Sequence, residues 1–315
     1  MPVAGEQTVI GSRRTPVDDA RRTLPVRWFV LIGVAAAVIG LIPWLVTGMR
    51  LPLQNLWAEA TLPGDMPLAL LPLNQYAVTL LFGLLVCGYG VVGLVGRCMR
   101  RTAPQHAVAA MGIGVLIVHA AATFQTTVTV ADGLLPSAIS AIYLTAMLAV
   151  IVASIAVGLL VLRLIGSAAV SGAVVGLTIA AVAVGYWITA FVNVVGLIDS
   201  WTPEATAFFV AGAWVPPVLT GLAIAWAGIG PRSRTAGGVI SLIVLWTLPA
   251  FLTAVQSVAG SRALLHQPSE LPGYAWRVFA GQLIDVRTAG FSLSVAVVIG
   301  VSGAMVVKLR KHTSE

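Results

Sequence analysis

Charged side chains are scarce in this sequence. Only 9% of the 315 residues are Asp, Glu, Lys or Arg, whereas 58% are hydrophobic and the mean hydropathy is +0.97. A soluble globular domain carries about 25% charged residues, and so few charges could not cover a water-facing surface of this size. The shortage excludes an ordinary soluble protein and indicates a chain whose surface faces lipid.

Cysteine is also nearly absent. The two cysteines, Cys87 and Cys98, fall on one predicted helix, and their spacing corresponds to about 16 Å along the helix axis. A disulfide needs Cα atoms within about 7 Å of each other. We therefore expect two free thiols that pack as small apolar side chains.

Motifs that carry chemistry are missing as well. The four histidines make no zinc-binding motif, and neither a phosphate-binding loop nor a nucleophile elbow is present. The run Gly88–Gly93 matches the dinucleotide pattern G-x-G-x-x-G, but it lies inside an apolar span rather than between a strand and a helix. We interpret these glycines as sites of close helix contact, and we predict neither a metal nor another cofactor.

What the sequence does contain is a series of long apolar runs. About 20 apolar residues in a helix cross the ~30 Å hydrocarbon core of a bilayer. Eight runs meet this length, and the fifth is long enough to tilt or break near Gly185. They cover residues 26–48, 76–96, 105–127, 137–162, 168–197, 206–229, 237–258 and 288–308. The predicted fold is an all-α polytopic membrane protein with about eight transmembrane helices in one bundle.

Lys and Arg are unequally divided between the two sides of these spans. Fourteen lie on the side of the N-terminus and four, Arg50, Arg262, Arg277 and Arg287, on the other. The positive-inside rule assigns the first side to the cytoplasm. We therefore predict a multi-pass protein of the cell membrane with a disordered cytoplasmic tail (1–25), a helical bundle (26–308) and a cytoplasmic C-terminal tail (309–315). Since the basic residues serve as orientation signals, no nucleic acid partner is expected.

Two longer links fall on the outer side, at residues 49–75 and 259–287. The first is too apolar for a solvated loop and too interrupted by proline for a span, so we predict a short interfacial helix and a turn. The second carries apolar residues at helical spacing, which predicts an amphipathic helix on the outer leaflet. From these two interfacial segments we select as candidate site residues Trp57, Glu59, Asp65 and Trp276.

Polar side chains recur on one face of several spans, mostly in the outer half. His119 and Thr123 share a face of the third span, and Tyr186 and Thr189 share one on the fifth. Polar groups in hydrocarbon tend to face the bundle interior or a water-filled cavity. One interpretation is an outward-facing polar cavity below the two outer segments, lined by His119, Thr123, Tyr186, Thr189, Asn193, Thr253 and Gln256. The other is a set of interhelical hydrogen bonds that bind no ligand.

Three functions remain open at this point, and the lipid bilayer is the one partner common to them. The first is a transporter or permease, slightly favoured because prolines in the sixth and seventh spans predict broken or kinked helices. The second is an outer-leaflet enzyme acting on a lipid or lipid-linked group, with acids drawn from Glu59, Asp65 and Asp132. The third is a noncatalytic subunit that packs against other membrane subunits.

These functions predict different structures. An open polar cavity would support the transporter, and clustered carboxylates would support the enzyme. A solid bundle with an apolar groove on its side would support the noncatalytic subunit.

Overall fold

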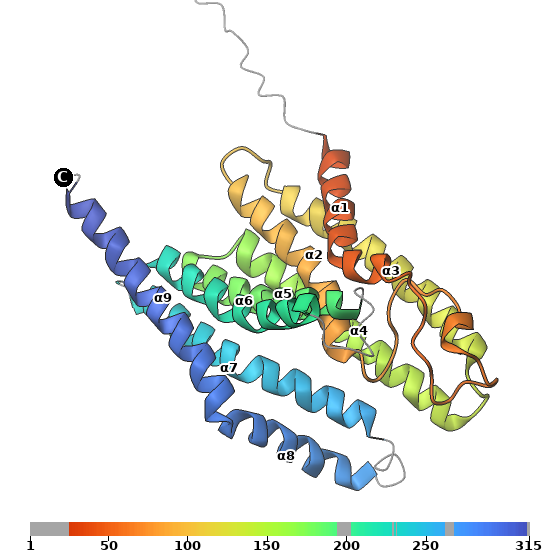
Figure 1. The fold of residues 1–315 in the computed structure, drawn as a ribbon. Coiled ribbons are helices and arrows are strands. Elements are labelled where there is room, and N and C mark those ends of the chain that lie inside the picture. Colours follow the sequence, from red (N-terminus) through yellow and green to blue (C-terminus); the bar gives the residue numbers. More distant parts are fainter. Residues whose placement is uncertain (1–24, 194–202, 229, 231, 262–267, 314–315) are drawn as a thin grey trace, which may run out of the picture.

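The computed structural model describes residues 25–193, 203–228, 230, 232–261 and 268–313, which form a bundle of nine α-helices (Figure 1). No β-strand occurs in these ranges, and short 3-10 turns lie at Pro63–Asp65, Ala190–Asn193 and Pro268–Glu270. The helices are α1 (Val26–Val46), α2 (Val78–Cys98), α3 (Ala107–Gly133), α4 (Ala138–Gly166), α5 (Val170–Thr189), α6 (Pro203–Ala227), α7 (Arg232–Gly260), α8 (Leu271–Ile284) and α9 (Val286–Thr313).

Every helix except α8 is long and apolar enough to cross a membrane. These eight helices coincide with the eight predicted spans, which confirms an all-α, multi-pass integral membrane protein in contact with lipid. The shorter α8 lies between α7 and α9, where the second interfacial segment was predicted.

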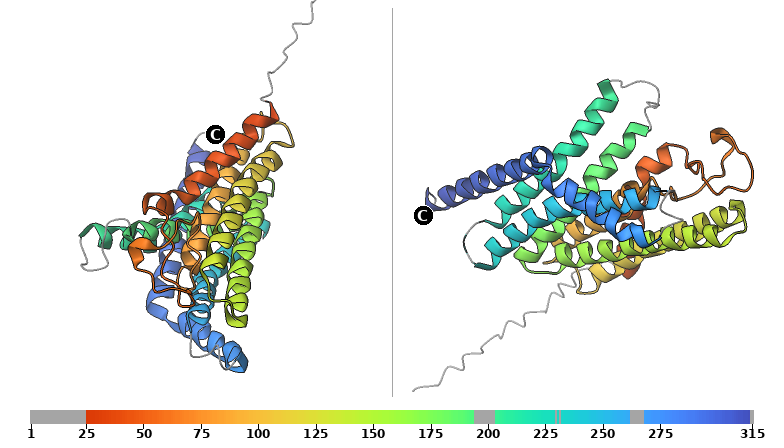
Figure 2. Two further views of the ribbon diagram at one scale, coloured as in Figure 1. Left: turned by 90° about the vertical axis from the view of Figure 1, so that its right-hand side faces the viewer. Right: turned by 90° about the horizontal axis from the view of Figure 1, so that it is seen from below.

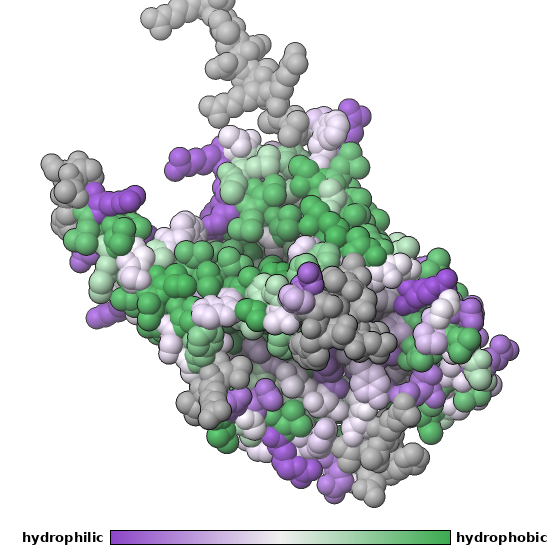
Figure 3. All heavy atoms as spheres, in the orientation of Figure 1, coloured by the Kyte–Doolittle hydropathy of each residue, from purple (hydrophilic) through white to green (hydrophobic). Residues whose placement is uncertain are grey.

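Successive spans run in opposite directions, so the bundle has two ends (Figure 1). The arginine-rich end, where α2 and α4 finish, carries Arg97, Arg100, Arg101 and Arg163. The opposite loop end carries residues 47–77 and α8. Figure 3 shows a broad apolar surface over α1 and α6, with hydrophilic residues toward both ends, as expected for a protein with a lipid-facing belt.

The centre of the bundle is α2, which contacts α1, α3, α4 and α5 along its length. In its most apolar stretch 72% of the residues are buried within the protein, compared with 17% for α9. The latter helix packs mainly on α6 and lies at the edge of the molecule in Figure 1 and in the right-hand view of Figure 2.

Glycine permits close contact at several helix crossings. A Cβ atom on Gly40 of α1 would lie 2.6 Å from the Leu84 carbonyl oxygen of α2, and one on Gly88 would lie 3.1 Å from the Ala36 oxygen. The Gly88–Gly93 run is therefore a packing surface, as the sequence indicated.

Proline does not break the helices that contain it. The sixth span runs without interruption through Pro216 and Pro217, and the seventh through Pro249. The fifth span likewise continues past Gly185, which packs against Pro216 and the Gly212 carbonyl of α6. The sequence predicted broken or kinked helices at the prolines, and neither helix is broken there.

The first interfacial segment, residues 47–77, forms an irregular chain with one 3-10 turn rather than the predicted short α-helix. Its prolines interrupt helical hydrogen bonding. Bonds to the bundle replace it: the Trp44 indole nitrogen donates to the Ala69 carbonyl at 2.8 Å, and the Leu71 backbone N–H donates to the Thr126 hydroxyl at 2.9 Å. The segment is thus fixed to the loop end.

Candidate functional site

His119 lies fully buried in the middle of the bundle. Its ring meets the Tyr89 ring of α2 edge to face, with centroids 5.3 Å apart. Neither ring nitrogen has a hydrogen-bond partner, and the Tyr89 hydroxyl has none either. The pair is a packed aromatic contact between α2 and α3 and does not open to the loop end.

Gln256 of α7 acts at a different depth. Its side-chain oxygen accepts bonds from the Thr79 backbone N–H at 3.1 Å and from the Thr79 hydroxyl at 2.9 Å. Thr79 lies in the first turn of α2, where backbone donors lack partners within the helix. Thr79 and Tyr89 are separated by about 15 Å along α2, so the structure does not bring Gln256 and His119 into one space.

The hydroxyls of the other candidate residues bond locally. The Thr123 hydroxyl donates to the His119 carbonyl at 2.7 Å, and the Thr189 hydroxyl donates to the Tyr186 carbonyl at 2.9 Å. Thr253 is half-buried on α7. The side chain of Asn193 falls outside the part of the chain that is described.

Tyr186 and Thr189 do line a hollow at the loop end. It has a volume of about 330 Å³ and is bounded by α5, the start of α2 and the 47–77 segment, through residues that include Trp44, Asn74 and Thr79. We call it the loop-end pocket. Two of the seven predicted cavity residues thus share a pocket, and Gln256 contacts its wall through Thr79.

The candidate residues of the interfacial segments do not cover this pocket. Trp57 packs against Gly133, where α3 ends, and Trp276 is 65% exposed on α8. Glu59 and Asp65 are exposed on the 47–77 segment. Within the described ranges, no group of three or more His, Cys, Asp or Glu side chains could hold a metal ion.

The residues that close the loop end were not selected from the sequence. The Gln125 side chain accepts from the Leu70 N–H at 2.9 Å and donates to the Leu68 carbonyl at 3.1 Å. The Tyr143 hydroxyl donates to the Gln54 side-chain oxygen at 2.7 Å. The available signal in the sequence was that Gln125 and Tyr143 lie near the ends of spans that adjoin the proline-rich segment on the same side of the membrane.

A larger hollow is an apolar groove on the side of the bundle, of about 1020 Å³. Its walls are α2, α5 and α6, and α1 contributes Ile39. At its deep end the Trp187 indole nitrogen donates to the Gly40 carbonyl at 2.9 Å and ties α5 to α1. We call this hollow the side groove. Its lining includes Cys87, Leu94, Arg97, Val184, Leu222 and Trp226.

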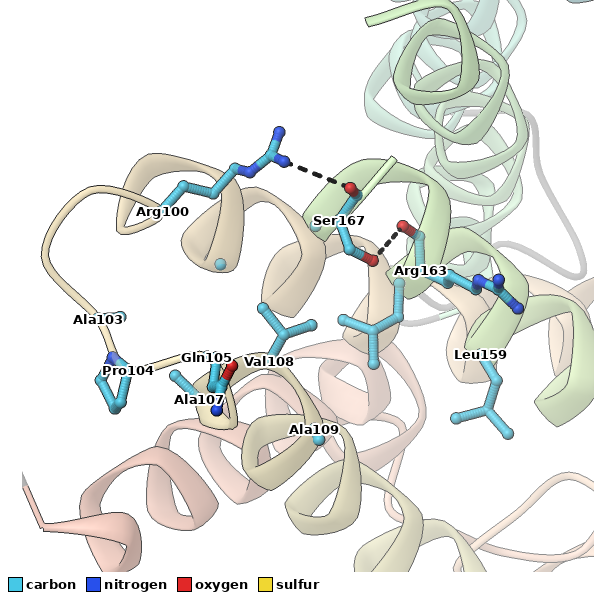
Figure 4. Close-up of a pocket in the computed structure, with 13 residues that line it drawn as sticks. Arg100, Ala103, Pro104, Gln105, Ala107, Val108, Ala109, Leu159, Arg163 and Ser167 are labelled. Atoms are coloured by element: carbon cyan, nitrogen blue, oxygen red, sulfur yellow. Dashed lines mark hydrogen bonds between the residues drawn. The ribbon is translucent and has the colours of Figure 1, made fainter. Parts of the chain in front are cut away.

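The side groove opens at the arginine-rich end, where Arg97, Arg100 and Arg101 line it. Arg97 lies 4.8 Å from the Trp226 ring centroid and donates to the Ile165 carbonyl at 2.8 Å. Arg100 also borders a separate hollow of about 510 Å³ between the ends of α2 and α4, which Figure 4 shows with the bond from Arg100 to the Ser167 carbonyl. Arg163 borders only that second hollow.

Both cysteines face the side groove. Cys87 is buried at depth and Cys98 is exposed near the arginines, and both thiols are free, as the sequence predicted. Comparisons with protein-family models, with curated proteins and with solved structures find no match to this chain.

Proposed function

We propose that this chain is a noncatalytic membrane protein that receives a hydrophobic guest from the bilayer in its side groove. The observation that carries the proposal is the groove itself, which is apolar, open on the side of the bundle and about 1020 Å³ in volume. Ligand pockets occupy about 300–1,000 Å³, so the groove offers room for one large guest.

The polar residues of the predicted cavity support the same function, because several of them form hydrogen bonds within the protein. Gln256 and Thr189 bond to neighbouring protein atoms, and bonds of this kind stabilise helix packing without any ligand. The unbroken course of α6 and α7 also removes the feature that favoured a transporter.

A groove-filling variant tests the proposal. Leu222 is 52% exposed in the groove, and Leu222→Trp should displace the guest; Leu160→Trp, on the exposed face of α4, is the matched control. Native mass spectrometry of the full chain in mild detergent should show a bound mass in the wild type and in Leu160→Trp, but not in Leu222→Trp. Equal retention by all three proteins would refute the proposal.

The loop-end pocket favours a second candidate, a permease-like protein that takes a small ligand from the outer side. Its carrying observation is the shared position of Tyr186 and Thr189 in a pocket of about 330 Å³. In a chain with Cys87→Ala and Cys98→Ser, Thr189→Cys should react with a membrane-impermeant maleimide in intact cells, whereas Thr123→Cys should not. An unreactive Thr189→Cys would exclude access from outside.

Membrane orientation is a further part of the proposal. We propose that the arginine-rich end and both termini lie in the cytoplasm of a cell-membrane protein, because basic residues are more frequent on the cytoplasmic side of a membrane. Reporters fused after Arg101 and after Arg234 should report the cytoplasm, and one inserted at Gly64 should report the outside. The opposite pattern would reverse the assignment of the two ends.

A further inference from the structure

The side groove has the depth of a single leaflet. Its α2 wall runs from Cys87 to the arginines just beyond Cys98, and these two cysteines are separated by about 16 Å along the axis. Half of a ~30 Å hydrocarbon core is about 15 Å. The apolar part of the groove therefore matches the acyl region of one leaflet, the leaflet at the arginine-rich end.

The mouth of the groove is positively charged. Arg97, Arg100 and Arg101 line it, and each guanidinium carries five N–H donors. Arg97 and Arg100 use some of these donors on the carbonyls of Ile165, at the end of α4, and of Ser167 and Ala168, in the turn that follows. These bonds hold the two side chains at the mouth and leave further donors for a ligand.

No carboxylate of the described ranges balances this charge. The acidic residues there are all at the loop end: Glu59, Asp65, Asp132, Glu204, Glu270 and Asp285. Among the residues that the structure describes, the cluster is thus a positive site without an acidic neighbour, about one leaflet's depth from Cys87. An indole at that level is also typical of membrane interfaces, and Trp226 lies beside Arg97.

We propose that the guest is one phospholipid with a net anionic headgroup, drawn from the leaflet at the arginine-rich end. Its acyl chains lie along Leu94, Val184 and Leu222, and its phosphate lies among the three arginines. The inference rests on the proposed function, because it names the guest of the same groove. A phosphate at headgroup level complements the charge of the three arginines at the mouth, and this charge complementarity is the reason for choosing a lipid.

A competition between two lipids tests this identity. The full-length chain in mild detergent is mixed with equal amounts of phosphatidylglycerol and phosphatidylcholine of identical acyl chains, and the retained lipid is weighed by native mass spectrometry. A basic residue near a membrane surface contributes about 1 kcal/mol toward anionic lipid. Since structural bonds occupy part of Arg97 and Arg100, we expect about tenfold preference for phosphatidylglycerol rather than the full sum.

Arginine variants locate the headgroup. Arg100→Gln with Arg101→Gln should abolish the preference, whereas Arg163→Gln, beside the neighbouring hollow, should leave it unchanged. Arg101 is exposed, so Arg101→Gln alone should reduce the preference about fivefold at unchanged thermal stability, and Arg101→Lys should restore it. Loss of preference in Arg163→Gln but not in the double variant would overturn the assignment to the groove.

The remaining outcomes separate the two proposals. Equal retention of both lipids, lost in Leu222→Trp, would overturn the anionic headgroup and leave a groove that holds a guest. A retained peptide mass would likewise overturn the anionic lipid as the guest and leave a groove that holds a guest. Lipid retention that Leu222→Trp leaves unchanged would indicate surface lipid only and would overturn both proposals.

Discussion

The loop end and the side groove use side chains in opposite ways. At the loop end, polar groups of α3 and α4 bond to the 47–77 segment and close the bundle, as with Thr126 and Leu71. In the side groove, the walls are mainly apolar, and the polar groups are the arginines at the mouth. The difference shows that polar residues within a membrane bundle can serve to close it, whereas the side groove is lined mainly by apolar residues of the kind that also face lipid.

The contrast predicts that substitutions at the loop end reduce stability and that substitutions in the groove reduce guest retention.

Removing the bonds between α3 and the 47–77 segment should have the largest effect. Gln125→Leu with Thr126→Val leaves the Leu70 and Leu71 N–H groups and the Leu68 carbonyl without these partners. A buried unpaired group costs about 1–3 kcal/mol. Since the bond to the Leu68 carbonyl is exposed and water can replace it, we expect a loss of about 2–4 kcal/mol, which comes mainly from the two N–H groups. Thermal unfolding in detergent measures it, with Thr145→Val as control, since Thr145 bonds only within α4. Similar stability of both proteins would contradict the sealing role.

The Tyr143 hydroxyl should contribute less. Tyr143→Phe removes its bond to the Gln54 side chain, and a single hydrogen bond contributes about 1 kcal/mol. Limited proteolysis should also cut residues 47–77 faster in this variant. Tyr274→Phe on α8 should behave as the wild type, and the account of the loop end fails if Tyr143→Phe does so too.

The bond between α7 and α2 should be weaker again. Hydrogen bonds between membrane helices average about 0.6 kcal/mol, and a double-mutant cycle with Gln256→Leu and Thr79→Val measures this coupling. We expect a coupling free energy near that value. Strictly additive effects would show that Gln256 faces a cavity rather than holding the two helices together.

Filling the side groove should leave the fold intact. Leu222→Trp alters a position that is 52% exposed, so stability should stay within about 0.5 kcal/mol of the wild type. A melting temperature far below that of Leu160→Trp would mean that the groove wall is part of the packed core.

The fold was largely predictable because hydropathy over twenty residues decides whether a helix can cross a bilayer. All eight spans followed from that pattern, and apolar residues at helical spacing predicted the helix between the seventh and eighth spans. The helices are not broken at Pro216 and Pro249, where broken or kinked helices were predicted, since local sequence does not show which neighbours stabilise a proline-containing helix.

The candidate site was less predictable, for two physical reasons. Helical spacing identified the face that carries His119 but could not show that its neighbour is Tyr89 rather than Gln256. The side groove lies between α1 and α6, over α2 and α5. Its Leu94 and Leu222 are as apolar as any lipid-facing residue. Hydropathy cannot separate a groove wall from the outer surface of a membrane protein.

Photocrosslinking in native membranes tests the central claim most directly. A benzophenone side chain at Leu94, 46% exposed in the side groove, is compared with one at Leu160, 48% exposed on α4. The account predicts one discrete phospholipid adduct at Leu94, reduced by Arg100→Gln with Arg101→Gln, and only diffuse bulk-lipid adducts at Leu160. The same adduct pattern at both positions would contradict it.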